Sequence, residues 1–213
     1  MRTVPTMLAG LMLVVAAQAG MAGPVQLKEV PAEAKWVLHV DMEALLQSSV
    51  GEMLRELAKD PVVGPKLAAI EAMFGLNLLK DIHGVTLWGP GAAENDMVLS
   101  VSGKLDRKLE VIIRAAGEYQ IQQYGSTTVH AWKDKGTLTY GCFARENQIL
   151  ISKNLTRLKQ TLDTIAGKNA GVRLPDIDMN NAGAGSVIMA SAKGIDGMEG
   201  LNLDENLRRV VEA

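Results

Sequence analysis

A short segment of this chain recurs 52 residues later, and a helical pattern follows each copy. Residues 94–100 read ENDMVLS, and residues 146–152 read ENQILIS. A period near fifty residues can signal a solenoid or a propeller, but two copies that include helices favour a duplicated strand–strand–helix unit in one α+β domain. The alternative is that two unrelated hairpin–helix units resemble each other by chance.

The stretch around these copies alternates between apolar and polar residues, with turn residues at regular intervals. This pattern predicts an antiparallel meander with strands at 119–124, 127–132, 137–144 and 148–152. Helices are expected over 105–116 and 155–166. The predicted fold class is α+β, with an antiparallel sheet and helices packed mainly on one of its faces. We expect the sheet to be built from a duplicated β-β-α unit, in an arrangement similar to a ferredoxin-like fold.

The chain before the repeat predicts two more strands and two helices. Strands are expected at 35–41 and 82–88, and helices from Val50 to Lys59 and from Pro65 to the stop at Gly75. In the first strand one face is apolar and the other is mixed, so we expect one buried side. The members of these faces are Trp36, Leu38 and Val40 on the apolar side and Val37, His39 and Asp41 on the mixed side.

The N-terminus has the pattern of an export signal. Arg2 precedes an 11-residue apolar run, and Ala17 and Ala19 then have the spacing that a signal peptidase accepts. The run is about half the length of a membrane span. We therefore expect residues 1–22 to be a cleaved signal peptide, with no stable membrane insertion afterwards and a periplasmic or extracellular location.

The rest of the chain divides into an α+β domain over residues 23–167 and a C-terminal part over residues 168–213. The latter contains a loop, an apolar strand at 186–192 and a helical stripe of Leu203, Leu207, Val210 and Val211. Two interpretations stay open. The strand and helix complete the first domain, or they begin a second repeat that is truncated.

Composition excludes several classes of protein. Lys and Arg total 22 against 24 Asp and Glu, and only 4% of residues are aromatic, which argues against nucleic acid as a partner. The single cysteine, Cys142, rules out an intramolecular disulfide and multi-cysteine metal sites. Because it lies in an apolar, strand-like stretch, we expect Cys142 to be a small core residue.

Few residues could carry chemistry. His39, His83 and His130, with Asp41 near the first, are the weak candidates for a metal or hydrolytic site. Their spacing matches no metal-binding motif, and each lies in or beside a predicted strand, so isolated strand histidines are the simpler interpretation. The sequence therefore predicts no catalytic, metal-binding or cofactor-binding residue and no cofactor.

Three segments resemble a group of exported bacterial proteins of unknown function: residues 35–41 (KWVLHVD), 80–89 (KDIHGVTLWG) and 128–132 (TVHAW). The resemblance covers about residues 30–166. It implies a chain that continues beyond this length, and it assigns no catalytic residue. The leading hypothesis is an exported, non-catalytic binding or structural protein that has an exported protein as partner. The alternative is a secreted hydrolase or metal-binding protein whose site is assembled from the scattered His and Asp residues.

Overall fold

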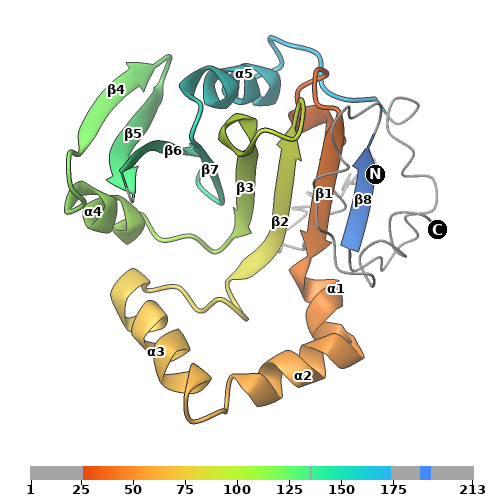
Figure 1. The fold of residues 1–213 in the computed structure, drawn as a ribbon, viewed down its shortest axis with the longest axis vertical. Coiled ribbons are helices and arrows are strands. Elements are labelled where there is room, and N and C mark those ends of the chain that lie inside the picture. The colour runs from red at the N-terminus through yellow and green to blue at the C-terminus, as the bar shows by residue number, and fades with distance from the viewer. Residues whose placement is uncertain (1–25, 135, 174–187, 193–213) are drawn as a thin grey trace, which may run out of the picture.

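Eight strands form one open antiparallel sheet in the order β4-β5-β6-β7-β3-β2-β1-β8 (Figure 1). The structure is a computed structural model that describes residues 26–134, 136–173 and 188–192. The strands are β1 (Trp36–Asp41), β2 (Ile82–Gly89), β3 (Val98–Gly103), β4 (Gln120–Tyr124), β5 (Thr127–Asp134), β6 (Thr137–Arg145), β7 (Gln148–Ser152) and β8 (Ile188–Ala192). The helices are α1 (Met42–Gln47), α2 (Ser49–Leu57), α3 (Val63–Phe74), α4 (Lys108–Arg114) and α5 (Leu155–Ile165), with short 3-10 turns η1 (Leu27–Glu29) and η2 (Glu94–Asp96).

The predicted meander is confirmed, because β4, β5, β6 and β7 pair in chain order. A long-range pairing then joins this meander to the first half of the chain. Strand β7 pairs with β3, and Leu99 on β3 lies directly opposite Ile151 on β7. The α+β class and the antiparallel sheet are therefore as predicted.

One face of the sheet, the core face, packs against α5 and η1. Leu158 and Leu162 of α5 are 0% and 7% exposed and pack in one cluster with Val98 and Leu150 of the sheet. Asn154 caps α5, since its side-chain oxygen accepts hydrogen bonds from the backbone N–H groups of Thr156 and Arg157. A helix with one apolar stripe is stable here because that stripe is buried on the sheet.

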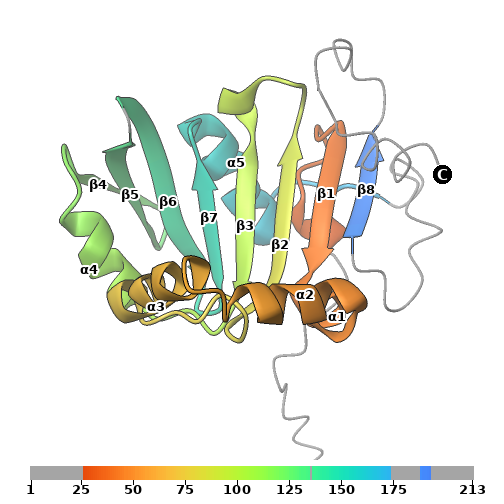
Figure 2. The same ribbon diagram turned by 60° about the horizontal axis from the view of Figure 1, so that its bottom comes forward.

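Helices α1, α2 and α3 connect β1 to β2 along one end of the sheet (Figure 2). Ser48 caps α2, and α3 ends at Gly75, whose φ of 63° is the left-handed conformation that favours glycine. The sequence analysis missed α1. Asp41, the last residue of β1, caps that helix by accepting a hydrogen bond from the Ala44 N–H at 2.9 Å.

Strand β1 buries the face opposite to the one that its apolar pattern indicates. The mixed-face residues Val37 and His39 are 1% and 5% exposed, whereas Trp36, Leu38 and Val40 are half-buried. The mixed side belongs to the core face, because it lies in the same layer as Trp88 and Val98. The strand has one buried side, as expected, but that side is the mixed one and not the apolar one.

At the C-terminal side, β8 pairs with β1 and forms one edge of the sheet. The strand expected at 186–192 is thus present from Ile188 to Ala192. The expected signal peptide over residues 1–22 and the expected closing helix around Leu207 lie outside the described residues.

Candidate functional site: the second face of the sheet

The face opposite to the core face carries two rows of aliphatic side chains that cross four adjacent strands. Directly paired residues form the first row, which is Leu38, Leu87, Leu99 and Ile151. The second row, two residues further along each strand, is Val40, Val85, Val101 and Ile149, and Phe143 on β6 continues it. We call these nine residues the open face.

All nine residues of the open face are half-buried, in contrast to the fully buried core face. Figure 2 shows α5 behind the central strands, whereas α1 to α3 lie in front along their lower end. Helix α4 packs against β5, to one side of the open face. Among the described residues, no helix therefore crosses the centre of this apolar surface.

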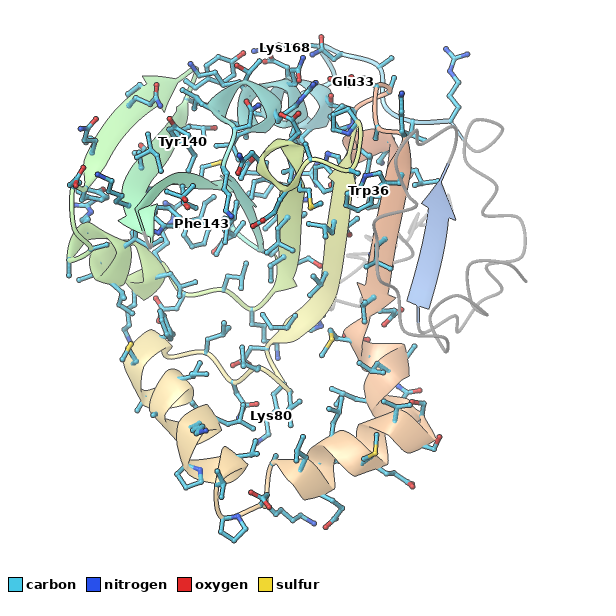
Figure 3. All side chains as sticks on the ribbon, in the orientation of Figure 1. Glu33, Trp36, Lys80, Tyr140, Phe143 and Lys168 are labelled. Atoms are coloured by element: carbon cyan, nitrogen blue, oxygen red, sulfur yellow. The ribbon has the colours of Figure 1, made fainter. Side chains whose placement is uncertain are left out.

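Two tryptophans bound the open face, each packed over a glycine of the neighbouring strand. A Cβ atom at Gly89 would lie 3.0 Å from Trp36 Cζ2, and one at Gly141 would lie 2.9 Å from Trp132 Cη2. The Trp36 indole also donates a hydrogen bond to the Gly91 carbonyl at 2.8 Å. Trp36 on β1 and Phe143 on β6 mark opposite sides of the surface in Figure 3. Each indole ring occupies the space that a side chain at the neighbouring glycine would need, so only glycine is compatible with the ring at that position.

Three basic side chains are exposed at the α4 edge of the open face, next to Asp106, which is 42% exposed and lies 3.4 Å from Lys108. On and just before α4, the side chains of Arg107, Lys108 and Arg114 are 66%, 74% and 58% exposed. The Arg107 guanidinium lies 5.0 Å from the centre of the Phe143 ring and so reaches the open face itself. Glu110, the acid that pairs with Arg107 and Arg114, is only 17% exposed.

The structure does not bring the three histidines together. His39 lies on β1 and His83 lies at the register shift of β2, and four strand spacings separate β2 from β5, which carries His130. That separation amounts to about 19 Å. Each imidazole also has its own partner: Thr86, Glu43 and the Tyr119 hydroxyl, at 2.8, 2.5 and 2.8 Å.

Burial lowers the pKa of His39 and of His130, so both are neutral at pH 7. For His39, desolvation outweighs the charge of Asp41, which raises the pKa. For His130, desolvation is again the main cause, and the Arg114 and Arg107 charges lower the pKa further against the opposing charge of Glu110. Within the part of the chain that is described, no three His, Cys, Asp or Glu side chains are grouped closely enough to hold a metal ion.

Sequence reasoning missed a polar network on the core face. The Glu29 carboxylate accepts hydrogen bonds from Arg145 at 2.5 Å and from Gln148 at 3.0 Å, and Gln148 also bonds to Ser100. Glu29 and Gln148 are 119 residues apart in sequence, so no local pattern connects them. The network ties η1 to β7 and β3.

Neither the imidazole of the His39–Thr86 pair nor Cys142 is exposed to solvent. His39 and Thr86 lie within hydrogen-bond distance, as a base and a nucleophile would, but His39 is only 5% exposed. Cys142 is 2% exposed, and burial raises the pKa of its thiol to about 12, which keeps it protonated. The prediction that Cys142 is a core residue is confirmed.

In the described segments, no helix has the length and apolar character required to cross a bilayer. The chain matches no family model, and the comparison with curated proteins gives no match. Crystal form III of TP0453, a Treponema pallidum protein, is similar with a TM-score of 0.49 and 11% identity, over 86% of this chain and 70% of that one. Crystal form IV of TP0453 gives a TM-score of 0.47 and 11% identity, over 86% and 71% of the two chains.

Proposed function

We propose that this chain is an exported, non-catalytic binding protein, and that the open face receives an amphipathic helix of a partner protein. The observation that carries the proposal is the pair of aliphatic rows, one of which contains Leu99 and Ile151, that no described helix covers. A contiguous apolar surface of this kind is typical of an interaction site.

The core face of the sheet supports a helix as the occupant, because a helix already packs there on β7, one of the strands of the open face. There, α5 covers β6 and β7 with the buried side chains Leu158 and Leu162, which are four residues apart. On the open face, the first row spans three strand spacings, or about 14 Å, and the second spans four, or about 19 Å, which is wide enough for a helix whose diameter with side chains is about 10–12 Å. A second helix would thus complete a sandwich of helix, sheet and helix.

A small apolar ligand fits the open face less well. Binding sites for small molecules are concave and enclose most of the ligand surface. The open face is one side of an extended sheet, so it would leave much of a single acyl chain in water. A helix buries one stripe and keeps its other side solvated, which suits such a surface.

The basic side chains beside the open face indicate the charge of the partner helix. Arg107, Lys108 and Arg114 are exposed at the edge where Phe143 ends the second row. Acidic residues on the flank of the partner helix would face them. Such pairs at a rim affect the association rate and the salt dependence more than the affinity.

A defined peptide tests this proposal. The probe is a labelled amphipathic helix of about 18 residues, long enough to be helical, with leucines on one face and glutamates on the other. We expect fluorescence anisotropy to show binding that weakens by roughly tenfold in the double variant Leu99→Thr, Val101→Thr, which removes apolar area from both rows.

Two controls accompany this measurement. Leu138→Thr changes a leucine that is 42% exposed but lies outside the open face, and it should leave the affinity unchanged. A peptide of the same composition with scrambled leucines should bind weakly. Equal binding of both peptides, or unchanged binding by the double variant, would reject the helix-binding surface.

We also infer that β2–β3 and β6–β7 descend from a duplicated strand–strand–helix unit. The direct pairing of Leu99 with Ile151, the same position in the two sequence copies, supports this idea, because a two-fold axis between β3 and β7 would relate the two hairpins. The following helices have diverged. Helix α4 packs on β5 beside the open face, whereas α5 packs on the core face.

A further inference from the structure

Strand β4 forms the free edge of the sheet opposite to β8, at the outer side of the molecule in Figure 1. Its sequence is QIQQY, and no Asp, Glu, Lys, Arg or Pro occurs between residues 119 and 132. The β4–β5 register is regular, without a bulge. Natural proteins protect sheet edges with charges, prolines or bulges, and β4 has none of these.

The hairpin register shows which backbone groups of β4 point away from the sheet. The two residues Gly125 and Ser126 connect Tyr124 to its partner Thr127, and the φ of 61° at Gly125 suits the first position of a type II′ turn. Because the pair that closes such a hairpin is hydrogen-bonded, the bonds alternate from there along the strand. The N–H and C=O groups of Ile121 and Gln123 therefore point outward.

These outward groups are available for pairing. No turn, loop or cap hydrogen bond between described residues uses the backbone of Ile121 or Gln123. The Ile121 side chain is also 57% exposed. The edge thus offers two N–H donors and two C=O acceptors beside an exposed apolar side chain.

We propose that β4 pairs antiparallel with β4 of a second copy of this chain and joins the two sheets across a two-fold axis. A two-fold pairing that uses the outward groups sets Ile121 opposite Gln123 of the partner subunit, which allows four backbone hydrogen bonds. In this register Gln122 lies opposite itself, and Gln120 lies opposite Tyr124. Every facing pair is uncharged, so the edge is complementary to itself.

Charge substitutions at Gln122 test this register. In Gln122→Lys two lysines would face each other across the axis, and in Gln122→Glu two glutamates would do so. Because like charges directly opposite destabilise a strand pair, we expect the dimer association constant to fall roughly five- to tenfold in each variant. Sedimentation velocity over a concentration series of the purified protein measures this constant.

An equimolar mixture of the two variants is the most direct test of this register. In a mixed dimer, the lysine of one variant would face the glutamate of the other and attract it. We expect the mixture to recover the dimer. The matched control is Gln120→Lys, which adds the same charge to the same strand but faces Tyr124 of the partner subunit, and it should stay dimeric. Circular dichroism verifies that each variant is folded.

Two results would overturn the proposal. The unaltered protein could sediment as a monomer at every concentration, which would show that β4 does not pair with β4 of a second copy. Alternatively, a dimer could form with the same association constant in the unaltered protein, both Gln122 variants and their mixture, which would place the interface elsewhere. Neither result bears on helix binding at the open face, which uses different strands.

Discussion

Leu99 and Leu150 lie on neighbouring strands of the sheet, but their side chains point to opposite faces. Leu150 is 0% exposed and packs against α5, whereas Leu99 pairs with Ile151 on the open face and is half-buried. In the two sequence copies, the open face of these strands is the more apolar one, since the core face also carries Ser100 and Gln148. The structure separates a face that α5 covers from a face that no helix of the described residues covers.

This separation predicts different costs for two similar substitutions. Leu150→Ala should lower the free energy of unfolding by about 2–5 kcal/mol, because it leaves a cavity under α5. Leu99→Ala should cost about 1 kcal/mol or less, because its site is partly open to water. Urea denaturation followed by circular dichroism measures both values, and equal costs would contradict the assignment of the two faces.

A glycine in β3 gives a second test of the fold. A Cβ atom at Gly103 would lie 1.9 Å from the Asp81 carbonyl oxygen, so Gly103→Ala forces the β2–β3 pair apart. We expect a loss of about 3 kcal/mol or more in thermal or chemical denaturation. Gly117→Ala is the matched control, since nothing lies within 4 Å of its Cβ position, and it should change stability by less than about 1 kcal/mol. Similar stabilities of the two variants would show that the path of the chain at Asp81 is wrong.

Acid should weaken the fold through His39 and His130. Burial lowers the pKa of both histidines from 6.5, so below about pH 6.5 the unfolded chain binds protons that the folded chain does not. The contribution of each histidine to stability is therefore complete above that pH. It falls, by at most about 1.4 kcal/mol per pH unit, as the pH decreases toward the lowered pKa.

The double variant His39→Gln, His130→Gln isolates this effect. Compared with the unaltered protein, it should lose less stability between about pH 7 and pH 5.5, since it lacks the two groups that titrate there. Urea denaturation at each pH gives the two slopes. Parallel slopes would mean that both imidazoles are solvated in the folded protein.

Much of the fold was accessible from the sequence, because local patterns determine it. Alternating residues and turn residues identified the meander, and helical spacing with the stop at Gly75 identified α2 and α3. The short helix α1 was missed, because its cap, Asp41, is also the end of a strand. Here the local patterns of strand and helix overlap.

The candidate site could not be predicted in the same way. On β3 and β7 the open face is the more apolar one, because the core face carries Ser100 and Gln148, so alternation alone points to the face that no described helix covers. The face that a helix covers depends on where α5 packs and on contacts such as Glu29 with Gln148, which are distant in sequence. The three histidines were candidates because imidazole binds metals, but they lie on three different strands and do not form one site.

Methyl NMR of the protein during titration with the amphipathic peptide tests the central claim most directly. We predict that the methyl signals of Leu87, Leu99 and Ile151 shift first and most, because these residues form the first row of the open face. The signals of Leu150 and Leu158, buried on the core face, should stay nearly constant. Shifts spread evenly over both faces, or confined to residues outside the open face, would contradict the account.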